Sequence, residues 1–198
     1  MGRPSLRYAQ TAAAAFEPLT LAELKLHLRC DVDADDALIT SLGVAARTYV
    51  ETRTNHILCG RTFYLEANAF PSDGSEIVFP IAPVTAIASV AYVDGSQTVQ
   101  TLAATYRLQS NIIPSRLRIA LTDSAWPVTG YADDAVRITA TVGYANAAAV
   151  PPQAKQAILL LVGHWYENRE AVVNGTISSD VKMTVEALLR NLWLAEIT

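Results

Sequence analysis

The stretch PPQAKQAILLLVGHWYENRE, residues 151–170, constrains the fold most, because it is long and apolar on more than one side. Its two leading prolines suit the first turn of a helix, where the missing N–H would have had no partner. A helix that continues to Asn174-Gly175, a pair suited to a left-handed cap, is therefore predicted. The three-and-four spacing of a core-facing stripe is followed by Ala154, Ala157, Ile158, Leu161, Val162 and Trp165.

Further apolar side chains lie outside this stripe. Leu159 and Tyr166 fall on one flank, whereas Leu160 projects from the opposite side together with Gln156 and Glu167. A helix that is apolar beyond one stripe must be covered on more than one side, by the chain's own elements or by a neighbouring subunit. On this stretch alone, the core helix of a monomer explains the pattern as well as a subunit contact does.

Residues 19–60 predict a helical hairpin. Thr20 and Glu23 have the spacing of a capping box, and apolar residues follow at helical spacing to about Arg29 or Cys30. A second helix is expected to end near Thr54-Asn55, and a tight acidic turn joins the two. The buried face predicted for the second helix consists of Leu38, Leu42, Ala45, Ala46 and Tyr49.

The acidic turn, residues 31–36, invites comparison with a calcium-binding loop. An EF-hand loop needs Gly at its sixth position and Glu at its twelfth, and this sequence has Asp36 and Leu42 there. We expect instead that Asp33 caps the second helix, while Asp35 and Asp36 lie in its first turn, where the helix dipole favours negative charge. No metal site is predicted.

Residues 61–148 change to a period of two, with β-branched and aromatic residues between turn signals. Strands are predicted at Thr62–Glu66, Glu76–Phe79, Val84–Val93, Tyr106–Gln109, Arg116–Leu121 and Ala135–Val142. Asp94-Gly95 predicts a hairpin turn, and a longer loop is expected from Trp126-Pro127 to Asp134. The expected fold class is α+β: a helical bundle formed by the N- and C-terminal helices, with an inserted antiparallel β domain, either a small sheet or a sandwich.

Residues 149–198 are expected to complete the helical body and to end in a docking tail. After a polar connection at Ile177–Lys182, the last helical stripe consists of Val185, Leu188, Leu189, Leu192 and Trp193. The chain then finishes on apolar residues, where most termini are polar and frayed. Residues 1–18 hold only a short Ala-rich run, too short for a helix alone, and are expected to form a flexible arm.

Composition excludes several classes of protein. The 198 residues are 51% hydrophobic and 17% charged, which is expected when copies of a chain cover part of its surface. The longest apolar run stops before His164, short of the roughly 20 residues of a membrane span. The N-terminus lacks the apolar core of a secretory signal, so a cytoplasmic chain with reduced Cys30 and Cys59 is expected. The net charge of −4, with basic residues densest only at Arg116 and Arg118, disfavours a groove that grips nucleic acid.

The sequence contains no signature of catalysis. It has no Gly-x-Ser-x-Gly elbow, no Gly-rich phosphate loop and no Cys-x-x-Cys pair. The best polar group is His164 with Glu167 and Asn168, which supplies too few ligands for a metal and is typical of a hydrogen-bonded packing residue. Arg169 and Glu170 suit an ion pair between subunits, and a solvated helix end explains them as well.

Three stretches carry a resemblance to a known family. They are PLTLAELKLHLRCDVDADDALI, AARTYVETRT and PPQAKQAILLLVGHWYENREAVV, of which the ILLLVGHWYENRE block is the most specific. With the Trp126-Pro127 loop and the strand end at Val142-Gly143-Tyr144, they resemble the head-to-tail connector (adaptor) proteins of long-tailed bacteriophages and prophages. The resemblance covers most of the chain after residue 18.

This resemblance implies a virion structural protein and not an enzyme, with no catalytic residue, cofactor or metal. Such connectors form a homo-oligomeric, dodecameric ring beneath the portal protein of the capsid and extend its DNA channel. They present the surface on which a stopper or tail-completion protein assembles, and double-stranded DNA passes through them without sequence-specific binding. The implied location is the neck of the virion, assembled in the host cytoplasm, and no membrane is involved.

Two sets of contact residues follow from this reading. Because family members use C-terminal segments to reach the portal, the expected portal-binding residues are Leu189, Trp193, Leu194 and Ile197. A ring of copies buries two different faces of every subunit, which fits a helix that is apolar beyond one stripe. The expected subunit-interface residues are Leu160, Tyr166, Glu167, Arg169 and Glu170.

Two alternatives remain open beside the connector. The first is a stopper or tail-terminator subunit, which would bind at the far end of the same neck. The second, from a different class, is a small hydrolase or ligand-binding protein with a pocket near His164 and Glu167. The connector reading is favoured, and it predicts an oligomer or a monomer that forms rings only on meeting the portal.

Overall fold

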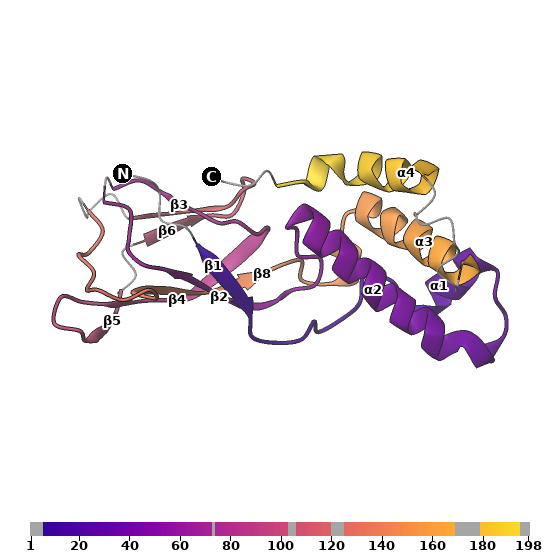
Figure 1. The fold of residues 1–198 in the computed structure, drawn as a ribbon, viewed down its shortest axis with the longest axis horizontal. Coiled ribbons are helices and arrows are strands. Elements are labelled where there is room, and N and C mark those ends of the chain that lie inside the picture. The colour runs from indigo at the N-terminus through magenta and orange to yellow at the C-terminus, as the bar shows by residue number, and fades with distance from the viewer. Residues whose placement is uncertain (1–5, 73, 103–105, 120–124, 169–178, 195–198) are drawn as a thin grey trace. The chain divides into compact units, whose positions relative to one another are not determined.

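The computed structural model describes residues 6–72, 74–102, 106–119, 125–168 and 179–194. The chain divides into two compact units. The β unit comprises Met1–Ala15, Gly60–Gly143 and Leu194–Thr198, and the helical unit comprises Phe16–Cys59 and Tyr144–Trp193. The predicted α+β class is confirmed (Figure 1).

The helical unit is built from two segments that lie before and after Gly60–Gly143, the main segment of the β unit (Figure 1). Its α-helices are α1 (Leu21–Leu28), α2 (Asp36–Thr54), α3 (Pro152–Glu167) and α4 (Ser179–Leu189). Single 3₁₀ turns lie at η1 (Asp33–Asp35), η2 (Ala147–Ala149) and η3 (Arg190–Leu192). Helix α3 packs against both α2 and α4.

Helix α1 begins and ends as its sequence predicts. The backbone N–H of Glu23 donates to the Thr20 hydroxyl at 3.2 Å, and the Thr20 N–H donates to the Glu23 carboxylate at 2.7 Å, which completes the capping box. At the other end Arg29 adopts a left-handed conformation with φ of 54°. Its N–H donates to the Leu26 carbonyl, which fixes the last turn of the helix.

The expected cap of α2 is wrong. Asp33 begins the 3₁₀ turn η1 instead, and α2 begins at Asp36, with no side-chain hydrogen bond from its N-cap residue Asp35. The reason is Lys25, whose ammonium binds Asp33 at 2.8 Å and Asp36 at 2.7 Å and so holds the turn against α1. The buried face of α2 also differs from the expected one: Ile39, Ala46 and Val50 are buried, whereas Leu38, Leu42 and Tyr49 are only partly buried and Ala45 is exposed.

The core stripe of α3 is confirmed, because all of its predicted residues are buried except the partly buried Trp165. Its predicted length is wrong, since the helix ends at Glu167 and Asn168 leaves the helical conformation. The predicted cap at Asn174-Gly175 lies outside the described residues. The polar connection expected at Ile177–Lys182 overlaps α4, which already begins at Ser179.

Buried polar groups close the helical unit at the end of α2. Glu51 is 5% exposed, and its carboxylate accepts the Leu58 N–H at 2.8 Å and the Arg47 guanidinium at 2.9 Å. His56 is 1% exposed, with Nδ1 at 3.2 Å from the Leu192 carbonyl and Nε2 at 3.1 Å from the Tyr144 hydroxyl. Because a carbonyl only accepts, Nδ1 carries the proton, and Tyr144 therefore donates to Nε2.

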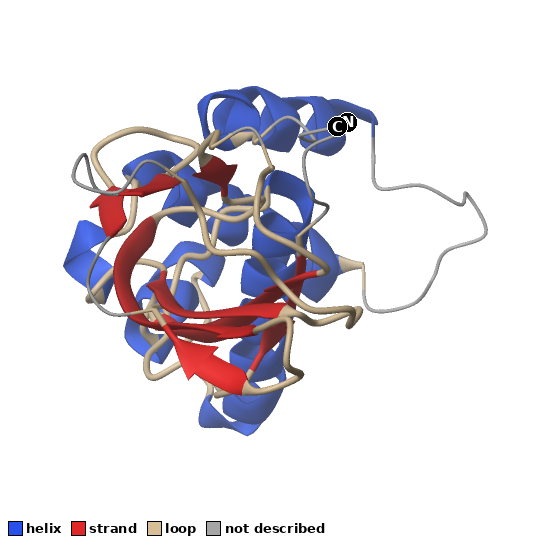
Figure 2. Ribbon diagram, turned by 90° about the vertical axis from the view of Figure 1, so that its left-hand side faces the viewer, coloured by secondary structure: helices blue, strands red, loops and turns tan. Residues whose placement is uncertain are grey.

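The β unit contains two antiparallel sheets, a five-stranded sheet in the order β1-β2-β8-β4-β5 and a three-stranded sheet in the order β3-β7-β6 (Figure 2). Every predicted strand is present. The strands are β1 (Arg7–Gln10), β2 (Arg61–Ala67), β3 (Ile77–Val78), β4 (Val84–Val93), β5 (Val99–Thr101), β6 (Tyr106–Gln109), β7 (Arg116–Ile119) and β8 (Val136–Val142). Along β8 every second residue from Val136 to Val142 is buried, which is the period-two pattern of a sheet with one face on a core.

Strands β1 and β5 are absent from the sequence-based expectation. β1 lies within the segment expected to be a flexible arm, and it pairs with β2 from Arg7↔Glu66 to Gln10↔Phe63. β5 follows a turn at the predicted Asp94-Gly95 position, where the Asp94 carboxylate accepts the N–H groups of Ser96 and Thr98. Both are exposed edge strands, whose pairing comes from backbone hydrogen bonds to a neighbour and not from apolar alternation.

Replacing Thr20 with Ala should lower the free energy of unfolding of the helical unit by about 1 kcal/mol, because the first turn of α1 loses a satisfied N–H. Thr20→Ser keeps a hydroxyl and is the matched control. Chemical denaturation followed by circular dichroism measures both variants. Equal losses for Ala and Ser would show that the capping box does not stabilise α1.

Burial lowers the pKa of His56 below its usual value, although its hydrogen bond to the Leu192 carbonyl opposes the shift. The unfolded chain therefore binds a proton more readily, so stability should fall as the pH drops below about 6.5, the ordinary pKa of histidine, towards the lowered pKa. His56→Asn keeps a donor for Leu192 and does not titrate. Thermal unfolding between pH 8 and 5 should show a shallower pH dependence in this variant, and identical profiles would contradict the assignment.

Candidate functional site

Of the predicted portal-binding residues, Leu189 and Trp193 belong to the helical unit, whereas Leu194 and Ile197 belong to the β unit. Leu189 and Leu194 are buried, at 2% and 5% exposure, whereas Trp193 is 49% exposed. The Arg53 guanidinium lies 4.3 Å from the centre of the Trp193 ring and also binds Glu186 at 3.3 Å. Trp193 is therefore held in place and still presents about half of its surface, while Ile197 lies outside the described residues.

The predicted subunit-interface residues of α3 have different surroundings. Tyr166 donates to the Asp35 carboxylate at 2.6 Å, and this hydrogen bond, with a further contact to the Cys30 thiol, raises the pKa of Tyr166 to about 12. Tyr166 thus fastens η1 to α3 within the same unit. Leu160 is partly buried and Glu167 is exposed, whereas Arg169 and Glu170 lie outside the described residues.

The polar group around His164 forms a hydrogen-bonded helix end. The Asn168 amide lies 3.4 Å from His164 Nδ1 and donates to the His164 carbonyl at 2.8 Å, and Glu167 is exposed. Among the described residues, no group of three or more His, Cys, Asp or Glu side chains is arranged to hold a metal ion. Both cysteines are free and buried, as the sequence predicts.

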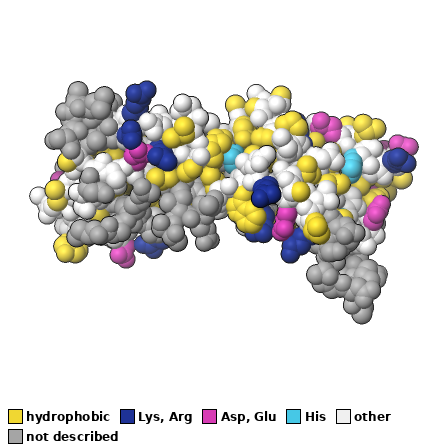
Figure 3. Space-filling model, turned by 90° about the horizontal axis from the view of Figure 1, so that it is seen from above, with side chains coloured by type: hydrophobic (Ala, Val, Ile, Leu, Met, Phe, Trp, Pro, Cys, Tyr) yellow, Lys and Arg dark blue, Asp and Glu magenta, His cyan; other side chains and the backbone are white. Residues whose placement is uncertain are grey.

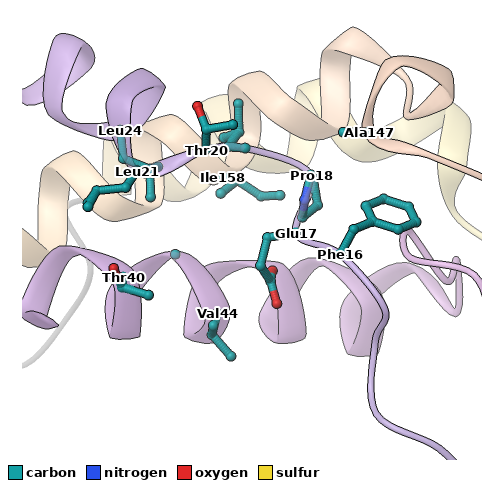
Figure 4. A pocket seen from close by; sticks show the side chains of 12 residues that line it. Phe16, Glu17, Pro18, Thr20, Leu21, Leu24, Thr40, Val44, Ala147 and Ile158 are labelled. Atoms are coloured by element: carbon teal, nitrogen blue, oxygen red, sulfur yellow. The ribbon is translucent and has the colours of Figure 1, made fainter. Parts of the chain in front are cut away.

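A hollow in the helical unit was not foreseen from the sequence. It has a volume of about 480 Å³ and lies where residues 16–20, α1, α2, η2 and the middle of α3 meet (Figure 4). Its wall is largely apolar, and it is formed by Phe16, Glu17, Pro18, Leu19, Thr20, Leu21, Leu24, Thr40, Gly43, Val44, Ala147 and Ile158. The one local signal was Gly43, an unfavourable residue inside a helix: a Cβ there would lie 2.9 Å from Leu24 Cδ1.

The helical unit also exposes several large apolar side chains, which Figure 3 shows between charged groups on the face in view. The most exposed are Leu26 at 80%, Met183 at 68% and Val32 at 63%. In the part of the chain that the structure describes, no helix has the length and hydrophobicity needed to cross a membrane. The described residues of the helical unit thus present exposed apolar side chains and a largely apolar hollow.

Comparisons with known proteins agree with this description. A family model described as "Phage gp6-like head-tail connector protein" matches residues 18–94 and 110–192. No match was found among curated protein sequences.

Solved structures give a second comparison. A chain from the neck of an empty GTA particle, computed with C6 symmetry, is 28% identical, with a TM-score of 0.77 and 97% of each chain covered. A chain from the virion of a native gene transfer agent (GTA) particle is 29% identical, with a TM-score of 0.76, over 96% of this chain and 97% of that one. A third, from the neck of a native GTA particle computed with C12 symmetry, is 26% identical, with a TM-score of 0.76 and 97% of each chain covered.

The family match spans most of the chain, including both segments of the helical unit and most of the β unit. The resemblance seen in the sequence is therefore confirmed, and the chain belongs to the family of Phage gp6-like head-tail connector proteins.

Proposed function

We propose that this connector subunit forms a ring of twelve copies in the neck of a phage-like particle, directly beneath the portal protein. The observation that carries the proposal is the likeness, over 97% of the chain, to chains from necks computed with C6 and C12 symmetry. Twelve copies satisfy both symmetries. The ring would extend the DNA channel of the portal and provide the platform for a stopper or tail-completion protein.

The charges of the described residues support a conduit through which DNA slides. Five arginines form ion pairs within the chain: Arg47 with Glu17 and Glu51, Arg53 with Glu186, Arg116 and Arg118 with the shared Glu76, and Arg137 with Glu66 and Asp134. A cation already paired with a carboxylate releases few counterions on meeting a phosphate, so its attraction for DNA is weak. A weakly attracting wall would hold the duplex without stalling it.

The role proposed is structural, without catalytic turnover, cofactor or metal. The proposed portal contacts are Leu189, Trp193, Leu194 and Ile197, of which Trp193 is half exposed and Leu189 and Leu194 are buried in the isolated chain. Neighbouring copies would meet at Leu160 and Glu167 of α3, next to Tyr166, with Arg169 and Glu170 following in sequence. Assembly would take place in the host cytoplasm, and the mature protein would reside in the neck of the virion.

Mixing the purified chain with the portal of its own particle should add a ring of twelve copies to one end of the portal in negative-stain images. Capsids made without the chain should carry no tails and retain DNA poorly. A ring that binds only a preformed neck, and never the bare portal, would favour a stopper or tail-terminator role. Turnover lost on His164→Ala with normal assembly would favour an enzyme.

Replacing Trp193 with Ala should weaken attachment to the portal on the order of 10-fold or more, because a half-exposed, oriented aromatic ring is typical of an interface hot spot. Met183→Ala removes another exposed apolar side chain of the same unit and serves as control. Co-sedimentation with portal measures both, and thermal unfolding verifies the fold. Equal attachment of the two variants would contradict the placement of the portal contact.

A further inference from the structure

The outward face of the three-stranded sheet in the β unit carries a cluster of arginines. The other face of this sheet is buried, at Ile77 of β3 and Leu117 of β7. Because side chains alternate along a strand, Arg116 and Arg118 point away from that core, and Arg107 of β6 lies directly opposite Arg118. Over the β unit, Figure 3 shows basic groups gathered beside an acidic one. The surface formed by Arg107, Arg116 and Arg118 is called the arginine face below.

A single carboxylate serves the arginine face. Glu76 binds the Arg116 guanidinium at 3.0 Å and also binds the Arg118 guanidinium. Within the described residues Arg107 has no ion-pair partner, and its side chain is exposed. Three positive charges against one negative charge leave an excess of two on this face, although the whole chain carries a net charge of −4.

This excess is unfavourable in the isolated chain. Like charges that lie directly opposite each other on antiparallel strands destabilise the pair, and Arg107 and Arg118 are placed in this way. The side chains of Arg116 and Arg118 are 43% and 52% exposed, so water and salt screen the repulsion only in part. A ligand that brings negative charge to the arginine face would relieve the repulsion.

The sheet geometry defines how that negative charge must be distributed. Opposite residues on antiparallel strands start about 5 Å apart, and successive outward residues of one strand start about 7 Å apart. The three arginines are therefore rooted within about 10 Å of one another. A ligand that neutralises the excess must present two negative charges within such a span.

Duplex DNA meets this requirement at every point along its length. Each strand carries one phosphate per roughly 3.4 Å of the helix axis, so about three phosphates of one strand fall within 10 Å. Guanidinium groups bind phosphate oxygens through paired hydrogen bonds. Two carboxylates of a protein would have to be held in one fixed register, whereas a sliding duplex always offers phosphates at this spacing.

We propose that the arginine face binds the phosphate backbone of duplex DNA and does not read its sequence. The proposal rests on the proposed function, because the connector role is what brings DNA past this chain. An excess of two charges per copy is small beside the roughly six to ten phosphate contacts of a protein that holds DNA tightly. The contact therefore guides the duplex without gripping it.

DNA binding by the full-length chain at different salt concentrations tests this contact. Titration of a mixed-sequence duplex into the labelled protein, followed by NMR, should shift the side-chain Nε–H signals of Arg107, Arg116 and Arg118. Each neutralised phosphate contributes about −0.9 to the slope of log K against log salt, so two should give about −1.8 and a roughly 10-fold loss of affinity between 50 and 200 mM salt. Absence of binding at low salt, or shifts confined to other residues, overturns the proposal.

Two substitutions should change this slope in opposite directions. Arg107→Gln removes one positive charge and should reduce the slope to about −0.9, whereas Glu76→Gln removes the one negative charge, keeps a hydrogen-bond acceptor, and should steepen it to about −2.7. Glu76→Gln should also strengthen binding at low salt, which loss of a purely structural ion pair would not do. Thermal unfolding of both variants verifies the fold.

Arg137→Gln is the matched control. It removes the same charge from another arginine of the β unit, one that already binds Glu66 and Asp134, and should leave the slope near that of the unaltered chain. If Arg137→Gln and Arg107→Gln reduce the slope equally, the effect belongs to the net charge of the chain, and the arginine face is not the site.

A polyglutamate peptide distinguishes the class of ligand. If the peptide shifts the arginine signals and the duplex does not, the partner is an acidic protein and the DNA assignment is wrong. The titration needs no ring, so its outcome is separate from that of the ring experiment. DNA binding by a chain that forms no ring with portal overturns the proposed function alone, and normal rings of a chain that does not bind DNA overturn the arginine face alone.

Discussion

The helical unit depends on one buried set of polar contacts, placed where the chain leaves for the β unit and where it returns. The Glu51 carboxylate accepts the N–H groups of Leu58 and Cys59, and Cys59 forms a parallel bridge with Tyr144. His56 bonds the Tyr144 hydroxyl beside them. These contacts hold the two ends of a long insertion together, so the helices can pack as though the insertion were a short loop.

Elements whose signals lie within their own segment were predicted well. The Thr20–Glu23 capping box and the strand Val84–Val93 agree with the structure to the residue. Elements that depend on partners far away in the sequence were not predicted. Strand β1, at Arg7–Gln10, is defined by its pairing with β2 far along the chain, and Asp33 fails as a cap because Lys25 binds its carboxylate. Local propensity cannot report either interaction.

The candidate functional site shows the same division between local signals, which the sequence revealed, and long-range contacts, which it did not. The last apolar stripe was visible in the sequence, and its Val185 and Leu189 are buried, but the half exposure of Trp193 results from tertiary packing that periodicity alone cannot resolve. The Tyr166–Asp35 hydrogen bond joins residues that lie far apart in sequence, and the hollow requires Phe16 and Ile158 to converge. Such sites follow from tertiary structure, and a sequence gives only indirect signs of them, such as a glycine inside a helix.

A contact between two subunits can be small and still be sufficient in a closed ring. Each copy has two neighbours, so leaving the ring breaks two contacts at once, and the last contact to form is intramolecular. Free chains, by contrast, must overcome the full loss of translational and rotational freedom for one contact. In the proposed ring, weak contacts between subunits would therefore favour chains that stay separate until the portal gathers them. Such an order of assembly would prevent rings from closing away from the capsid.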